Sequence, residues 1–220
     1  MKKIQLKNIN ELNNYDLFVV DFDGTVVDTM VMWRYICPNF LIYKGINTDD
    51  DVLALVSSLT NKEIAKMMKE RYFPNQSVEE VTFDFFEYIK SQYVNQKVKE
   101  NATILLEELN KIGNVILYSA TAKYLVEILV DICGLRKYFS EIYSGSDLGI
   151  TKRDGTGYLE VIKMCGSPKN VLVLEDAPHA FKGAASQGLD VLVISDVSNI
   201  NYMDEVEKYS KYFVDFNDFI

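Results

Sequence analysis

The sequence predicts an α/β protein in which a doubly wound parallel sheet carries a helical domain inserted after its first strand. Two observations support this fold. Four short and almost uniformly apolar runs lie at 17–22, 114–119, 170–176 and 190–195, and such runs are typical of strands buried on both faces of a parallel sheet. A long stretch with helical character separates the first run from the second. That stretch is too long to be an ordinary connecting loop, so it indicates an insertion.

The segments between the later strands predict amphipathic helices. In "AKYLVEILVDICG" (122–134), one face carries Leu125, Ile128, Leu129 and Ile132, and a glycine follows, as at many helix ends. Segments 156–166 and 177–188 repeat this pattern. Strands and helices that alternate in this way favour a doubly wound sheet.

The inserted stretch from about 30 to 96 is helical throughout and rich in aromatic residues. Thr60, followed three residues later by Glu63, predicts a capping box at the start of one of its helices. The sequence contains no Gly/Ser-rich linker, so we expect short hinges near 27–30 and 96–101.

Composition limits the classes of function. With 220 residues, 48% of them hydrophobic, the chain can bury a full core. A net charge of −9 argues against a nucleic-acid partner, because binding phosphates requires clustered positive charge. The N-terminus lacks the apolar run of a signal peptide, and no stretch is long enough for a membrane span. Three widely spaced cysteines indicate neither disulfides nor zinc. We therefore expect a cytoplasmic protein that binds no membrane, and a monomer or weak homodimer.

Polar side chains follow the predicted strands at the edge where parallel sheets bind ligands. They are Asp21, Asp23, Ser119, Lys152, Glu175 and Asp176. Carboxylates brought together in this way need a cation, and a set of oxygen ligands suits Mg²⁺. A hydroxyl and an ammonium beside them are what a phosphoryl group requires. The constellation therefore indicates phosphoryl transfer.

Four segments resemble the motifs of the haloacid dehalogenase (HAD) superfamily, in the same order. "DFDGTVVDT" (21–29) is similar to motif I, "ILYSAT" (116–121) to motif II, Lys152 to motif III and "VLVLEDAPHAFKGAASQG" (171–188) to motif IV. The long gap after motif I resembles the subgroup with phosphoglycolate phosphatases and β-phosphoglucomutases. The resemblance implies a Rossmann-like core domain at 1–28 and 100–220, with a helical cap domain at 29–99.

The resemblance also implies roles for the motif residues. Asp21 would be the nucleophile that forms an aspartyl phosphate, and Asp23 the general acid and base. Asp21, the backbone carbonyl of Asp23, Glu175 and Asp176 would bind Mg²⁺, with Glu175 acting directly or through water.

The phosphate-binding groups implied by the resemblance come from three segments. They are the backbone around Phe22, Gly24 and Thr25, the Ser119 hydroxyl with the Ala120 N–H, and Lys152. The sequence departs from many relatives in lacking a proline after Lys152, which leaves Arg153 as an alternative for motif III. Lys152 is preferred because an ammonium is the more compact charge. Ala180 stands where some relatives have a further aspartate.

These residues favour a Mg²⁺-dependent phosphatase that acts on a small phosphorylated metabolite. A phosphosugar mutase of the β-phosphoglucomutase type would use the same groups and remains an alternative. A dehalogenase is disfavoured, because its chemistry does not call for an acid at Asp23 or a metal. A signalling receiver domain also pairs acids with a hydroxyl, a lysine and Mg²⁺, but it would lack the large insertion. A binding protein on a retired enzyme fold is disfavoured by the complete set of catalytic groups.

Overall fold

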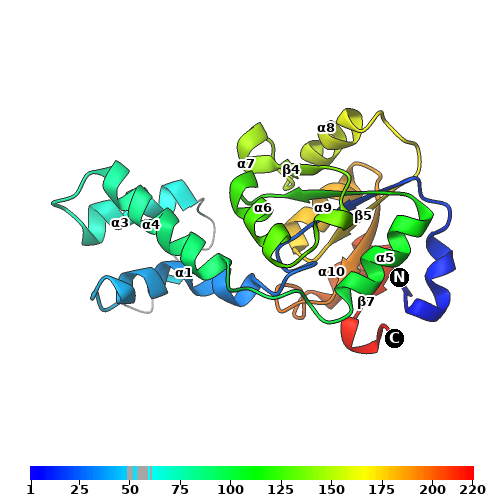
Figure 1. Cartoon of the computed structure of the whole chain (residues 1–220), viewed down its shortest axis with the longest axis horizontal. Helices are drawn as coiled ribbons and strands as arrows, with labels where there is room; N and C mark the ends of the chain where they lie inside the picture. The colour runs from blue at the N-terminus through cyan, green and yellow to red at the C-terminus, as the bar shows by residue number, and fades with distance from the viewer. Residues whose placement is uncertain (49–51, 54–58, 60) are drawn as a thin grey trace. The chain divides into compact units, whose positions relative to one another are not determined.

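The computed structural model describes residues 1–48, 52–53, 59 and 61–220 and confirms the predicted α/β fold (Figure 1). The chain forms two compact units, one comprising 1–30 with 96–220 and the other comprising 31–95. The expected boundaries at 28/29 and 99/100 lie within a few residues of this division. The assignment of the smaller unit as a cap domain stays a prediction. The capping role expected for Thr60 falls on a residue outside the described ranges.

The larger unit is built on a sheet of seven strands, in which every neighbouring pair is parallel. The strands are β1 (Lys2–Lys3), β2 (Leu17–Val20), β3 (Asn114–Ser119), β4 (Ile142–Ser144), β5 (Val171–Glu175), β6 (Asp190–Ile194) and β7 (Tyr212–Val214). The four apolar runs are β2, β3, β5 and β6. The three other strands have two or three residues each, too few for an alternating or apolar pattern to be visible in the sequence. Because β1 precedes β2, the insertion follows the second strand of the sheet.

The strand order, β1-β7-β6-β5-β2-β3-β4, places β2 near the centre. After β2 the chain builds β3 and β4 on one side, then returns to the other side of β2 to build β5, β6 and β7. The direction of winding therefore reverses between β2 and β5. In open α/β sheets a crevice forms at such a reversal, beyond the carboxyl ends of the strands.

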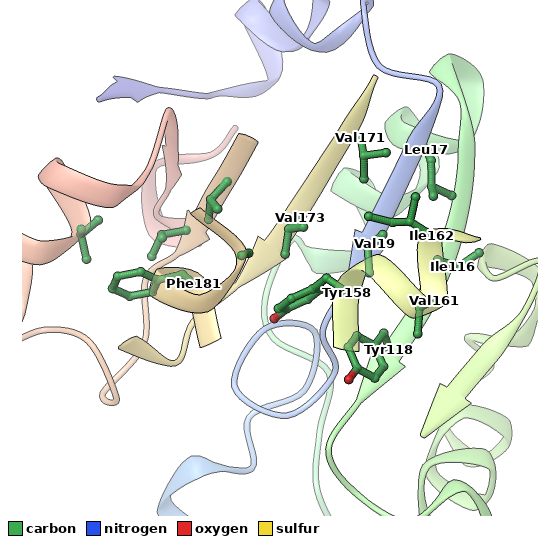
Figure 2. Packing of buried hydrophobic residues seen from close by; sticks show 14 residues of the cluster. Leu17, Val19, Ile116, Tyr118, Tyr158, Val161, Ile162, Val171, Val173 and Phe181 are labelled. Atoms are coloured by element: carbon green, nitrogen blue, oxygen red, sulfur yellow. The ribbon is translucent and has the colours of Figure 1, made fainter. Parts of the chain in front are cut away.

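The central strands are buried on both faces, as their uniform apolar character predicts. On one face, Val19, Ile116 and Val173 belong to a cluster that includes residues of α8 (Thr156–Met164) and α9 (Pro178–Ser186), as Figure 2 shows. The alternate residues Phe18 and Leu174 are also at most 1% exposed. Further elements of this unit are η1 (Leu6–Leu12), α5 (Ala102–Ile112), α6 (Lys123–Ile132), η2 (Arg136–Tyr138), α7 (Gly145–Leu148), α10 (Met203–Tyr209) and η3 (Phe216–Asp218).

The buried face of α6 differs from the expected one. Leu125 and Leu129 are buried as predicted, but their buried neighbours are Val126 and Val130. Ile132, the last residue of the helix, is 59% exposed. The buried stripe consists of two adjacent pairs four residues apart, 125–126 and 129–130. The buried face is therefore rotated about the helix axis from the face that the leucines and isoleucines predicted.

The smaller unit contains α1 (Met30–Tyr43, of which Met30 belongs to the larger unit), α3 (Asn61–Tyr72) and α4 (Val78–Tyr93). Aromatic rings pack together in its core, where the ring centre of Phe40 lies 5.2 Å from that of Phe85 and 5.5 Å from that of Tyr88. Trp33 packs against Tyr93. Among the described helices of the whole chain, none combines the length and the apolar character needed to cross a membrane.

The two segments that connect the units run side by side within the larger unit. Val27 pairs in antiparallel fashion with Val98. The backbone N–H of Asp28 donates to the carbonyl of Lys97 over 2.8 Å, and that of Lys99 donates to the carbonyl of Val26 over 2.9 Å. These bonds hold the two connecting segments to each other, close to the expected hinges.

The loop that carries Lys152 packs tightly on α9 at Gly183. A Cβ at Gly183 would lie 2.2 Å from the carbonyl oxygen of Lys152 and 2.9 Å from that of Arg153. Both obstacles are backbone atoms, so the loop would have to move. The absence of a side chain at Gly183 thus allows the Lys152 loop to lie directly against α9.

Replacing Gly183 with alanine tests the close approach, because helix propensity and overpacking predict opposite changes in the free energy of unfolding. Helix propensity alone would make Gly183→Ala about 1 kcal/mol more stable, whereas overpacking costs about 1–3 kcal/mol. We expect the clash to dominate and the free energy of unfolding, measured by urea denaturation, to fall. An increase in stability would contradict the close approach.

Candidate active site

The site is organised by the register of three neighbouring strands. Val20 of β2 pairs with Leu117 of β3 and Leu174 of β5, and the N–H of Asp21 continues this ladder by donating to the carbonyl of Leu174 over 2.9 Å. One residue further along each strand, Tyr118 of β3 and Glu175 of β5 lie level with Asp21. Because side chains alternate between faces, Asp21 therefore lies between Tyr118 and Glu175 on the face covered by α8.

Lys152 connects two of the buried carboxylates. Its Nζ donates to Oδ1 of Asp21 and, over 2.6 Å, to Oε1 of Glu175. Lys152 is 6% exposed, whereas the neighbouring Arg153 is exposed, so the structure brings Lys152 and not Arg153 to the cluster. Burial alone would lower the pKa of Lys152, but Asp21 and Glu175 outweigh burial and raise it. The lysine therefore stays charged.

Both oxygens of Glu175 accept hydrogen bonds. Oε1 accepts from Lys152 and from the hydroxyl of Tyr158 over 2.9 Å. Oε2 accepts from the backbone N–H groups of Asp176 and Ala177 over 3.0 and 3.1 Å. Four donors fix this carboxylate at the point where β5 ends and α9 is about to begin.

Asp176 is fully buried and accepts hydrogen bonds from two hydroxyls. Thr25 donates to its Oδ1 over 3.1 Å, and Ser198 donates to its Oδ2 over 2.6 Å. Gly24 passes very close, with a φ of +85°, and a Cβ there would lie 2.4 Å from Oδ2 of Asp176. Only glycine combines this left-handed conformation with such an approach.

Asp23 is partly exposed and faces the ends of β3. Its Oδ2 accepts from the hydroxyls of Ser119, over 3.2 Å, and Thr121, over 2.8 Å. Thr121 also donates its N–H to Oγ of Ser119 over 3.0 Å. Motif I and motif II are therefore in direct contact, at the edge of the sheet where the sequence places both.

Three carboxylates form a candidate cation site. Ligand oxygens of Asp21, Glu175 and Asp176 all lie within 4.8 Å of one another, and all three residues are buried. Burial, followed by the charge of Glu175, raises the pKa of Asp21 well above its ordinary value and that of Asp176 to about 8. Lys152 thus leaves part of the negative charge uncompensated, and these oxygens fit a hard divalent cation. Because Glu175 already accepts four hydrogen bonds, Asp21 and Asp176 have more capacity to bind it.

The remaining predicted residues adjoin this cluster. Phe22 and Thr25 are both buried, and the hydroxyl of Thr25 donates to Asp176. Ala120 is exposed and directly follows Ser119. Their roles in phosphate binding stay predictions. The side chain of His179, the single histidine, is exposed in the first turn of α9.

Four residues of the site were not expected from the sequence. They are Thr121, Tyr158, Ser198 and Asn199, of which the last donates to the carbonyl of Asp176 over 2.9 Å. Ser198 and Asn199 lie shortly after the predicted strand at 190–195. Their position beyond its carboxyl end is a signal that could have identified them. Tyr158 carries no such signal, because a tyrosine on an apolar helix face usually belongs to the core.

Several solved structures are similar to this one. A protein of Thermotoga maritima named as a candidate β-phosphoglucomutase is 19% identical, with a TM-score of 0.76, covering 93% of this chain and 96% of its own. CbbY of Rhodobacter sphaeroides, solved with phosphate, is 16% identical, with a TM-score of 0.71 and coverage of 93% and 95%. YfnB of Bacillus subtilis, a candidate HAD hydrolase bound to magnesium, is 16% identical, with a TM-score of 0.68 and coverage of 90% and 93%. These likenesses show the fold.

Membership of a family follows from the sequence itself. The model of the haloacid dehalogenase-like hydrolases matches residues 15–188, which is most of the chain. The match includes all of the clustered carboxylates and Lys152. The chain belongs to the haloacid dehalogenase-like hydrolase family.

Proposed function

We propose that the protein is a Mg²⁺-dependent phosphatase that hydrolyses a small phosphorylated metabolite through an aspartyl phosphate on Asp21. The proposal rests on one observation, the contact of Lys152 with Asp21, which itself belongs to the cluster of three buried carboxylates. A nucleophile, an ammonium and a cation site at one strand end are the groups that phosphoryl transfer uses. Asp23, hydrogen-bonded to Ser119 and adjacent to this group, adds an acid and base.

In the first step, a carboxylate oxygen of Asp21 attacks phosphorus and the bond from phosphorus to the ester oxygen breaks. Asp23 gives its proton to the departing oxygen, which leaves as an alcohol. The hydroxyls of Ser119 and Thr121 hold the Asp23 carboxyl at Oδ2.

In the second step, water attacks the phosphorus of the aspartyl phosphate while Asp23 takes a proton from it. The bond between Asp21 and phosphorus breaks, and inorganic phosphate is released. Lys152, charged and held on Asp21, stabilises negative charge on the reacting oxygens.

The proposed ligands for the cation are Asp21, Asp176 and the backbone carbonyl of Asp23, with Glu175 directly or through water. Mg²⁺, when bound there, supplies positive charge that offsets the charge of the phosphoryl oxygens. The backbone around Phe22, Gly24 and Thr25, the Ser119 hydroxyl and the Ala120 N–H are the proposed donors to those oxygens. The phosphate in the CbbY structure and the magnesium in that of YfnB support both proposals.

A phosphosugar mutase is the second candidate. It is favoured by the similarity to the Thermotoga protein named as a candidate β-phosphoglucomutase. In a mutase, the aspartyl phosphate would pass its phosphoryl group back to a sugar hydroxyl rather than to water. Incubation with β-glucose 1-phosphate distinguishes the two, because a phosphatase releases inorganic phosphate whereas a mutase forms an isomeric sugar phosphate.

Replacing the proposed nucleophile should abolish activity. Hydrolysis of p-nitrophenyl phosphate should require Mg²⁺ and fall below detection in Asp21→Asn, because the amide cannot form the acyl phosphate. Asp28→Asn, which changes an exposed carboxylate of the same loop, is the matched control and should keep full activity. Activity that survives Asp21→Asn or an excess of EDTA would exclude this mechanism.

Replacing Asp23 should slow both steps. We expect Asp23→Asn to lower kcat by about 10²- to 10⁴-fold, the usual contribution of a general acid and base. The amide keeps the size of the side chain, so KM should change far less. Steady-state kinetics with p-nitrophenyl phosphate measure both constants, and an unchanged kcat would assign the proton transfers to another group.

The stabilisation by Mg²⁺ should increase with pH. Because the pKa of Asp176 is raised to about 8 and that of Asp21 is also raised, the metal-free folded protein retains protons that unfolded carboxyls lose near pH 4. The stabilisation that these retained protons give to the metal-free protein is therefore lost as the pH rises from about 4 to about 8. Since Mg²⁺ must displace these protons, the increase in Tm on adding Mg²⁺ should be larger near pH 8 than near pH 5. A constant or opposite trend in differential scanning fluorimetry would contradict this charge balance.

A further inference from the structure

Tyr158 is a buried tyrosine whose hydroxyl points at the catalytic cluster and not into an apolar core. It lies in α8, is 1% exposed, and donates to Oε1 of Glu175 over 2.9 Å. Its ring belongs to the apolar cluster beneath the site, where Figure 2 shows it beside Tyr118. The two rings meet edge to face, with centroids 5.3 Å apart.

Lys152 has little freedom in this environment. Its Nζ lies 5.0 Å from the ring centre of Tyr118 and 5.7 Å from that of Tyr158, while Asp21 and Glu175 accept its hydrogen bonds. Aromatic faces attract a desolvated ammonium, but they do not direct its N–H groups. Direction comes from the carboxylate oxygens of Asp21 and Glu175, so the position of Glu175 is one of the two restraints that decide where Lys152 points.

The hydroxyl of Tyr158 restrains the one Glu175 oxygen that Lys152 uses. The backbone N–H groups of Asp176 and Ala177 hold Oε2, whereas Oε1 accepts only side-chain donors, namely Lys152 and Tyr158, in the hydrogen bonds described above. Without the tyrosine hydroxyl, Oε1 would be held by Lys152 alone, and this oxygen could shift with the lysine while Oε2 stays on the backbone. The bond from Tyr158 thus fixes Glu175 as an independent anchor for the ammonium.

We propose that Tyr158 is a positioning residue, whose hydroxyl holds Glu175 so that the Lys152 ammonium stays on the reacting carboxylate of Asp21. Its contribution to rate rests on the proposed function, whereas its effect on Lys152 does not. The hydroxyl takes no part in bond making or breaking.

Tyr158→Phe tests the proposal, because it keeps the ring in the core and removes only the hydroxyl. We expect kcat for p-nitrophenyl phosphate with saturating Mg²⁺ to fall about tenfold or more, the size expected for a lost hydrogen bond to a charged group. KM should change by less than about threefold, since the phosphate-binding backbone is untouched. The assay is run well below the Tm of the variant, where nearly all of the protein is folded and a loss of stability alone would leave kcat unchanged.

Tyr15→Phe is the matched control. The hydroxyl of Tyr15 also donates to a carboxylate, Oδ2 of Asp190, over 2.6 Å, and Tyr15 is 6% exposed. Tyr15 precedes β2 and Asp190 is the first residue of β6, so this pair lies at the edge of the sheet opposite the site. Tyr15→Phe should lower Tm as Tyr158→Phe does, yet keep the wild-type kcat.

A spectroscopic measurement on the whole chain tests the same contact without turnover. The buried ammonium of Lys152 should give a protected ¹H–¹⁵N signal, which Lys152→Arg identifies by its loss. Tyr158→Phe should abolish this protection, and Tyr15→Phe should preserve it. If the wild type fails to hydrolyse p-nitrophenyl phosphate, the proposed function is wrong, and this signal still decides whether Tyr158 holds Lys152. A wild-type kcat or an unchanged signal in Tyr158→Phe would overturn the proposal.

Discussion

The ion pairs of Lys152 with Asp21 and Glu175 are the interaction on which the rest of the site depends. They join a loop to the ends of two adjacent strands, at the point where the winding of the sheet reverses. All three groups are buried, so the loss of Lys152 would leave both carboxylates without compensation, at a cost of about 3–5 kcal/mol. Such a cluster is costly to build for stability alone. Its placement at the edge where doubly wound sheets bind ligands gives it a chemical purpose.

The fold serves this cluster in two ways. Parallel strands bring carboxylates from separate parts of the chain to neighbouring positions, and their register aims Asp21 and Glu175 at the same face. Close backbone approaches then set the spacing, at Gly183 beneath the Lys152 loop and at Gly24 against Asp176. Burial, together with the excess of negative charge that remains, raises the pKa values of Asp21 and Asp176, and that excess makes the site suitable for a divalent cation.

Much of this arrangement was predictable from the sequence, because its signals are local. The apolar runs identify the central strands, and acids directly after them must meet at one edge. The short strands β1, β4 and β7 were missed, since backbone pairing with a neighbour defines them and no side-chain pattern does. Thr121, Tyr158 and Ser198 were missed for a related reason. Their roles depend on contacts between separate elements, over 98 residues for Thr121 with Asp23, 17 for Tyr158 with Glu175 and 22 for Ser198 with Asp176, and no local pattern marks such contacts. The apolar face of α6 shows the same limit, because burial of Val126 and Val130 follows from packing.

The central claim is that Asp21 carries the phosphoryl group during turnover. Reduction with borohydride during hydrolysis of p-nitrophenyl phosphate tests it directly, because an acyl phosphate is reduced to an alcohol whereas a free carboxylate is not. Tandem mass spectrometry should then find homoserine in place of aspartate at position 21, and only when substrate and Mg²⁺ are both present. Homoserine at another position, or an unmodified Asp21 in protein that is actively turning over, would contradict the account.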